Sequence, residues 1–189
     1  HFRQLGVRCM NFLLPDMTHD SRTSWYSGHA PAPAADFLLP VFEEWWQEDN
    51  PSVRVLVFWE LISALLGGPP SSDCFGGAAL GYVIVETDGE IETMDALRVC
   101  KHRLPSTSLN VHSSGFEDLE WGSPWVHEIT TRGLPVPSAC KPCRYARVCA
   151  GGSLPHRYSE ARGFDNPSVW CSDIQRLLDR MSRAIEDAR

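Results

Sequence analysis

Four cysteines near the C-terminal end of the chain have the spacing of a soft metal site. Cys140 and Cys143 form a Cys-x2-Cys pair, which lets two thiolates from one tight loop reach a single centre, and Cys149 can return from the next turn. Cys171 is the natural fourth ligand, because a glycine pair at 151–152 lets the chain bend back. Four thiolates suit tetrahedral zinc and a [4Fe–4S] cluster alike. The spacing predicts a metal or cluster site, with unrelated buried thiols as the less favoured alternative.

Two histidines near the N-terminus offer a different chemistry. His19 and His29 lie in sequence near the carboxylates Asp16 and Asp20, a combination that could serve acid–base catalysis or hold a metal. No HExxH-type spacing accompanies them. We therefore expect these histidines to be solvated or to line a substrate groove.

The elements that must position these side chains begin with alternating strand and helix patterns. An apolar run over 5–14 predicts a strand buried on both faces, and residues 21–34 have loop composition. Asp36 is expected to cap a helix that carries Pro40 near its first turn. The β-branched segment 53–58 predicts a second strand, followed by a helix that ends at a glycine pair. This order is typical of parallel α/β architecture.

The pattern changes after the two prolines at 69–70. Apolar residues alternate on either side of Asp88-Gly89, which is the strongest hairpin signal in the chain. Residues 101–139 show no sustained period and receive no assignment. A C-terminal helix is expected from 166–168 onward, with Cys171 in its first turn, where free N–H groups favour a thiolate. Its apolar face would comprise Val169, Ile174, Leu177, Leu178, Met181 and Ile185.

The overall composition excludes several classes of protein. Hydrophobic residues make up 43% and charged residues 22% of the 189, as in ordinary globular proteins. A net charge of −7 with dispersed Lys and Arg argues against nucleic acid as a partner. No apolar run approaches the roughly 20 residues that span a bilayer, and no signal peptide is recognisable. We therefore expect a cytoplasmic protein without a membrane partner, whose thiols are metal ligands or catalysts rather than disulfides.

Beyond spacing, several segments carry a family resemblance. The stretch CKPCRYARVCAGGSLPHRYSEARGFDNPSVWC resembles the C-terminal part of a SPASM domain, the auxiliary iron–sulfur module of radical SAM peptide and protein maturases. Within that group, LLPDMTHD, ETDGEIETMD and GGSLPHRY…GFDNPSVWC resemble the FxsB-like and XyeB-like maturases of ribosomal peptides. The resemblance covers most of the chain, and 140–171 is its most specific part.

The resemblance assigns the cysteines to clusters. In the family, a CxxC pair, the cysteine after it and the final cysteine bind the second auxiliary cluster, a set that matches Cys140, Cys143, Cys149 and Cys171. An early pair and a further cysteine serve the first cluster. The corresponding positions here are Cys74, Met94 and Ser153, so a single cysteine of this set is kept. The resemblance thus implies one auxiliary [4Fe–4S] cluster, with Cys74 and Cys100 as free thiols.

The same resemblance implies an architecture and an activity. Residues 1–70 would be the C-terminal strands and helices of a partial (β/α) barrel, and 71–189 a SPASM-like domain with a β-hairpin and a C-terminal helix. The parent would be an oxidoreductase that cross-links a ribosomally synthesised precursor peptide. The CxxxCxxC loop that cleaves S-adenosylmethionine with a second [4Fe–4S] cluster is absent from these residues, and the chain starts with His1. We therefore expect a C-terminal portion that is inactive alone. The alternative is a non-catalytic peptide-binding module with a structural zinc or iron–sulfur site.

Some remaining residues have expected structural roles. His156 could replace a cysteine in a zinc site, but the resemblance favours hydrogen bonding of His156 and Arg157 to the cluster loop. Cys9 is expected to be buried in the first strand. The tryptophans at 45–46 and 59 are expected to be core residues rather than substrate contacts.

Overall fold

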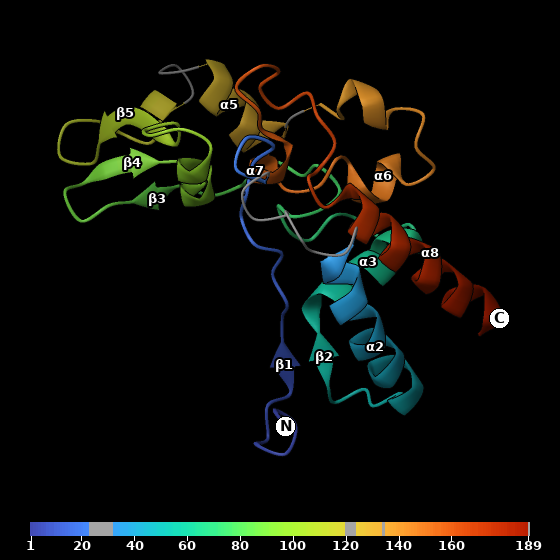
Figure 1. The fold of residues 1–189 in the computed structure, drawn as a ribbon. Coiled ribbons are helices and arrows are strands. Elements are labelled where there is room, and N and C mark those ends of the chain that lie inside the picture. Colours follow the sequence, from blue (N-terminus) through green and yellow to red (C-terminus); the bar gives the residue numbers. More distant parts are fainter. Residues whose placement is uncertain (23–31, 120–123, 134, 189) are drawn as a thin grey trace.

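The computed structural model describes residues 1–22, 32–119, 124–133 and 135–188. Short strands and helices follow one another along the chain (Figure 1). Their order is β1 (Cys9–Met10), α2 (Pro33–Glu48), β2 (Arg54–Val55), α3 (Leu56–Leu65), β3 (Ile84–Val85), β4 (Glu90–Glu92), the 3₁₀ helix η1 (Asp95–Val99), β5 (Ser106–Asn110), α5 (Pro124–Thr131), the 3₁₀ helix η2 (Ser138–Cys140), α6 (Ala146–Cys149), α7 (Leu154–Arg157) and α8 (Cys171–Asp187). Within these ranges, no helix combines the length and apolar character needed to cross a membrane.

The first strand differs from its prediction. β1 is two residues long and pairs in parallel with β2, with Cys9 opposite Arg54. Met10 and Phe12 pack against the core, whereas Cys9 and Leu13 are exposed. The prediction of a strand buried on both faces, with Cys9 inside it, was therefore wrong. Alternate side chains are covered because helices pack on one face of this pair in the described structure.

The second strand is also shorter than expected, because helix α3 begins at Leu56. The β-branched segment predicted as strand thus supplies the first helical turn. The N–H of Val57 donates a hydrogen bond of 3.1 Å to the side-chain oxygen of Asn11, a residue of a distant segment. This bond satisfies a donor that the helix itself leaves unpaired.

Helix α2 starts earlier than predicted and contains a proline. Ala32 occupies the N-cap position, and Asp36 lies inside the first turn rather than at the cap. Pro40 is consequently in the middle of the helix, not near its start. The segment 21–34 that was expected to be loop lies largely outside the described residues.

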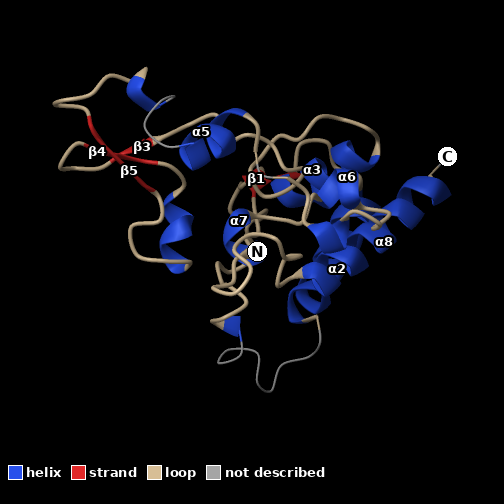
Figure 2. Ribbon diagram, turned by 90° about the horizontal axis from the view of Figure 1, so that it is seen from above, coloured by secondary structure: helices blue, strands red, loops and turns tan. Residues whose placement is uncertain are grey.

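A helical layer forms the larger core, in which α8 packs across α2 and α3 (Figures 1 and 2). The predicted C-terminal helix is confirmed, with Cys171 as its first residue. Its apolar face buries Ile174, Leu177, Leu178 and Met181 against a group that includes Phe42, Phe58, Leu61 and Trp170. Trp45 and Trp46 pack against this core, but Trp59 is exposed beneath the guanidinium of Arg54, contrary to prediction.

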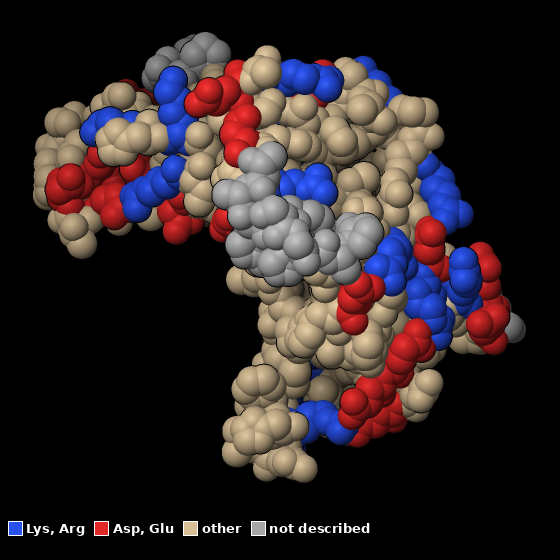
Figure 3. Space-filling model, in the orientation of Figure 1, with Lys and Arg blue, Asp and Glu red and all other residues tan. Residues whose placement is uncertain are grey.

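Ion pairs cover the outer surface of the same layer. Arg176 Nη1 lies 2.7 Å from Asp36 Oδ1. Arg180 donates from Nε and Nη2 to the two carboxylate oxygens of Glu43. Figure 3 shows the result on one face, where acidic and basic side chains form mixed clusters over the helices rather than a single basic area. The polar sides of α2 and α8 therefore complement each other in charge.

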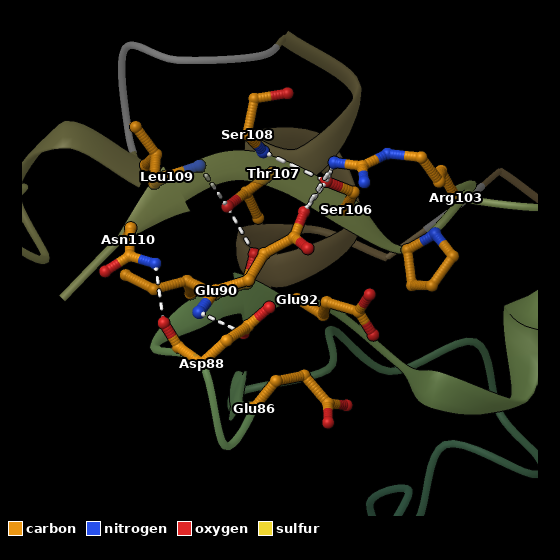
Figure 4. A network of polar contacts seen from close by, with 12 residues as sticks. Glu86, Asp88, Glu90, Glu92, Arg103, Ser106, Thr107, Ser108, Leu109 and Asn110 are labelled. Atoms are coloured by element: carbon orange, nitrogen blue, oxygen red, sulfur yellow. Dashed lines mark hydrogen bonds and ion pairs between the residues drawn. The ribbon is translucent and has the colours of Figure 1, made fainter.

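A small antiparallel sheet lies at the opposite end of the molecule (Figure 2). β3 pairs with β4 around Asp88-Gly89, which confirms the hairpin, and β4 pairs with β5, which sequence analysis left unassigned. In Figure 4 the Asp88 side chain accepts the N–H of Glu90, and the Asn110 amide donates to the Asp88 carbonyl. A second, smaller core of Leu80, Met94, Leu97, Ile129 and Leu154 lies between this sheet and the helical layer.

Candidate metal centre and the cavity beside it

The four cysteines of the predicted site line one cavity. Cys140 is the last residue of η2, Cys143 lies in the turn that follows, Cys149 ends α6 and Cys171 begins α8. Tyr145, Ile174 and Leu178 form part of the wall. The chain therefore brings together all of the thiols that the spacing predicted, from elements separated in sequence.

The sharp reversal after Cys149 depends on three successive residues with positive φ. They are Ala150 (49°), Gly151 (92°) and Gly152 (78°). A Cβ at Gly151 would lie 2.7 Å from Cδ of Pro137, which is too close for a real contact. The glycine is therefore required both by its backbone conformation and by the loop packed against it. The turn directs the chain away from α6 and permits the return to Cys171.

Burial and mutual proximity shape the electrostatics of the thiols. The pKa of Cys149 is raised to about 12, mainly by burial; the N–H of Gly151 lowers it, and the neighbouring Cys171 and Cys140 act in the same direction as burial. Burial also raises the pKa of Cys171, with Cys140 and Cys143 acting in the same direction. Four thiolates so close together repel each other, and a bound cationic metal offsets that repulsion. The donor set therefore fits a thiolate-bound metal group.

Hydrogen-bond donors point at Cys143 as well. The N–H of Tyr145 lies 3.4 Å and the side-chain amide of Gln175 4.0 Å from the Cys143 sulfur. Neither residue was expected from the sequence, although the position of Tyr145, two residues after a CxxC cysteine, is a signal that could have identified it. Such donors stabilise negative charge on sulfur and tune the potential of iron–sulfur groups.

The arrangement also bears on the size of the bound group. In the described part of the chain, no set of three or more His, Cys, Asp or Glu side chains is arranged so that it could hold a single metal ion. The four cysteines nevertheless surround one cavity. Four thiolates around one cavity suit tetrahedral zinc and a [4Fe–4S] cluster alike.

Arg157 supports this loop from behind. Its Nε donates 3.1 Å to the Phe164 carbonyl and its Nη2 2.7 Å to the Pro135 carbonyl, so the buried guanidinium ties together the segments before Cys140 and before Cys171. Asp165 adds a bond of 2.6 Å from the N–H of Ser138. This agrees with a supporting role for Arg157. His156, in contrast, is not among the residues that line the cysteine cavity, and among the described residues its Nε2 has no hydrogen-bond partner in the loop.

His156 instead faces a second cavity of about 240 Å³. Cys74, Met94 and Ser153 line it together, although they lie far apart in the sequence. Ile174 belongs to the walls of both cavities, which are therefore neighbours. Burial, followed by the charge of Asp73, raises the pKa of the Cys74 thiol to about 12.

The other thiols lie elsewhere. Cys100 packs against the smaller core, and burial raises its pKa to about 12. Cys9 is exposed. Neither residue lines the cysteine cavity.

The described members of the N-terminal histidine and carboxylate group contact different partners. His19 Nε2 lies 2.8 Å from the carbonyl oxygen of Pro167, and Asp20 accepts the N–H of Glu160. Both residues thus connect the N-terminal segment to loops before α8. Asp16 faces His156, and His29 lies outside the described residues.

Comparisons with known proteins give distant relatives. No family model matches the chain. The cysteine-type anaerobic sulfatase-maturating enzyme of Clostridium novyi (strain NT) is 21% identical over 182 residues, and that of Clostridium perfringens is 23% identical over 182 residues. These alignments cover 95% of this chain but 47% and 48% of the relatives. The chain thus spans about half the length of the curated relatives it matches.

Solved structures of the same kind share the fold. Native anSMEcpe with bound AdoMet and the Kp18Cys peptide aligns with a TM-score of 0.77 at 22% identity, over 99% of this chain and 51% of that one. Native anSMEcpe with bound AdoMet and the Cp18Cys peptide gives 0.74 at 21% identity, over 99% and 52%. The mixed α/β arrangement of this chain is therefore that of part of these enzymes.

Proposed function

We propose that the chain is the auxiliary iron–sulfur region of a radical SAM/SPASM maturase that cross-links a ribosomally synthesised precursor peptide. The observation that carries this proposal is the convergence of Cys140, Cys143, Cys149 and Cys171 on one cavity. Relatives named as sulfatase-maturating enzymes, and a neighbour holding AdoMet and a peptide, support peptide modification. The ribosomal class of peptide rests on the FxsB-like and XyeB-like motifs alone.

The proposal divides the chain into two parts. Residues 1–70, with the parallel pair β1–β2 and helices α2 and α3, would be the later elements of a partial barrel. Residues 71–189 would be the SPASM-like domain. S-adenosylmethionine cleavage requires a CxxxCxxC loop that these 189 residues do not contain, so the reaction needs residues outside them. Four reduced thiols of this kind persist best in a reducing compartment such as the cytoplasm.

Within the proposed site each residue has a physical role. The four thiolates would hold one [4Fe–4S] cluster, which supplies one-electron transfer when bound. Tyr145 and Gln175 donate toward the Cys143 sulfur, and the Gly151 N–H acts on Cys149. These donors stabilise negative charge on the sulfurs. A single cluster is proposed because Met94 and Ser153 in the neighbouring cavity offer no thiolate beside Cys74.

Anaerobic reconstitution with iron and sulfide tests the proposal. We expect a brown protein with about four irons per chain. The Cys171→Ala variant should lose most of this iron, whereas Cys9→Ala, which removes an exposed thiol outside the site, should keep it. Colourless protein with one tightly bound zinc would reject the cluster and support a zinc-stabilised binding module instead. Full iron in Cys171→Ala would reject the ligand set.

A further inference from the structure

The cavity that contains Cys74, Met94 and Ser153 is large enough for a ligand group. Its volume of about 240 Å³ far exceeds the roughly 10–15 Å³ that one water molecule requires. Its walls come from the segment after β1, from α3, from the loop before β3, and from η1, α7 and α8. It therefore lies where the N-terminal and C-terminal parts of the chain meet.

The charge of the walls has one sign. Four carboxylates, those of Asp16, Glu60, Asp73 and Asp95, line the cavity, and none of its described lining residues is Lys or Arg. Neutral donors bind three of them: Tyr82 donates 2.7 Å to Asp73, Ser72 donates 3.0 Å to Glu60, and the N–H of Ala96 donates 2.9 Å to Asp95. In the described ranges, none of the four carboxylates forms an ion pair with Lys or Arg. The cavity thus attracts a cation and repels an anion.

A buried and unpartnered nitrogen in the same wall points to a polar occupant. His156 is 5% exposed, and its Nε2 has no hydrogen-bond partner among the described residues. The same atom lies 3.5 Å from Asp16 Oδ1, within ion-pair range but outside hydrogen-bond geometry. A buried polar atom left without a hydrogen bond destabilises the fold. A group in the cavity that donates hydrogen bonds to both Nε2 and the Asp16 carboxylate would satisfy this atom.

The remaining wall is apolar and aromatic. Phe12, Leu14, Phe75 and Met94 line the cavity together with the ring of Tyr82. Such a surface packs against an aliphatic stem, and aromatic faces attract an adjacent cation. A bare metal ion gains nothing from it, and no set of three donors among the described residues here could hold one. The combination fits an organic cation on an aliphatic stem.

We infer that this cavity binds the side chain of a lysine or arginine in the peptide that the protein modifies. That the cation belongs to a peptide rests on the proposed function, whereas the preference for a cation rests on the cavity alone. An anionic cluster with thiolate ligands would be repelled by the same carboxylates. The positions that match the family's first-cluster ligands, Cys74, Met94 and Ser153, thus line a pocket that selects a basic side chain of the peptide.

Methyl NMR of methionine provides a direct test. Met94 lines the cavity, whereas Met181 is buried in the helical core away from it. With ¹³C-methyl methionine in the protein, titration with Nα-acetyl-lysine methylamide should shift the Met94 signal saturably and leave Met181 unchanged. The uncharged isostere Nα-acetyl-norleucine methylamide should shift neither. Equal responses to the two probes, or no response, would overturn the inference.

Variants of the walls sharpen the result. Asp73→Asn should weaken binding of the lysine probe by about tenfold, as expected for a lost charged hydrogen bond. Glu60→Gln serves the same purpose if Asp73→Asn is poorly folded. Asp187→Asn makes the same charge change at the exposed end of α8 and should bind like the wild type. Unchanged binding in both wall variants would contradict the assignment.

Two further comparisons separate the possible sources and the two proposals. Putrescine, a free amine, should bind more weakly than a short lysine-containing peptide; tighter binding of putrescine would reject a peptide side chain as the occupant. Iron content is measured on the same samples. If the protein binds lysine but takes up no iron, the cluster is rejected and the lysine pocket is supported. If it takes up four irons but does not bind lysine, the lysine pocket is rejected and the cluster is supported.

Discussion

Asp179 connects the cysteine loop to helix α8 through two donors. The Tyr145 hydroxyl donates 2.7 Å to its carboxylate, and the guanidinium of Arg144 contacts the same oxygen. Burial alone would raise the pKa of Asp179, but these hydrogen bonds outweigh it and hold the pKa below the usual 3.8. The ionised carboxylate therefore stabilises the folded state.

This depressed pKa predicts an acid-dependent loss of stability. The contribution of Asp179 is fully present above pH 3.8 and declines as the pH falls through the lower folded value. Urea unfolding of the metal-free protein between about pH 6 and pH 3 should show a smaller decline in Asp179→Asn than in the wild type. Asp187→Asn, with the same charge change in the same helix, should decline like the wild type. Identical curves for all three proteins would show that the carboxylate does not link the loop to α8.

Single residues differed in how far the sequence revealed them. Cys140, Cys143, Cys149 and Cys171 could be predicted as one group because their spacing reflects short loops and one helix start. The position of His156 could not be predicted, because this side chain faces Asp16, a residue 140 positions away in the sequence. Side chains that meet only through tertiary packing leave no local pattern.

The turn between α6 and α7 is the element on which the cysteine geometry depends. Gly151→Ala would combine a positive φ with a Cβ placed 2.7 Å from Pro137. Gly163→Ala is a matched control, since its φ is also positive, at 56°, but its Cβ would meet nothing within 4 Å.

We expect both glycine variants to lose stability and Gly151→Ala to lose about 1–3 kcal/mol more, the usual cost of overpacking. Urea unfolding measures the difference, and iron content should fall in Gly151→Ala alone. Equal losses in the two variants would mean that Pro137 yields without cost and that backbone strain alone acts there.

At the scale of elements, prediction succeeded where local signals dominate. The hairpin is marked in the sequence by its turn residues Asp88-Gly89, and helix α8 is marked by the helical period of its apolar residues. α3 begins earlier than its β-branched residues suggest, because Asn11 satisfies the Val57 N–H from another segment. β5 has the polar sequence STSLN and is held partly by the Thr107 hydroxyl, which donates to the Ile91 carbonyl, so no apolar alternation marked it.

Across the whole molecule, one core joins the N-terminal helices to the cysteine site. Phe42 is fully buried and shares its cluster with Val148, Ile174 and Leu178, which lie beside the cysteines. Phe42→Ala should therefore cost about 3–5 kcal/mol and reduce iron retention from a distance. Phe37→Ala removes a ring that is 59% exposed on the same helix and should cost far less. Urea unfolding and iron content measure both effects. Unchanged iron retention in Phe42→Ala would show that the two halves act independently.

The α/β class could be predicted from the order of patterns, but the way the halves pack could not. The sequence showed a change of character near residue 70. It did not show that α8, from the far end of the chain, would cover α2 and α3. That contact depends on complementary faces, such as Arg176 against Asp36, which become recognisable only when the helices are placed side by side.

The arrangement of the cysteines along the chain also implies an order of events. Cys140, Cys143 and Cys149 lie on one short segment whose turns need few distant contacts, so the loop that carries them can form early. Cys171 is the first residue of α8, the helix that packs on α2 and α3. If the proposed cluster binds, three of its ligands would be in place on one short segment, and the fourth would join once α8 has folded against the rest of the molecule.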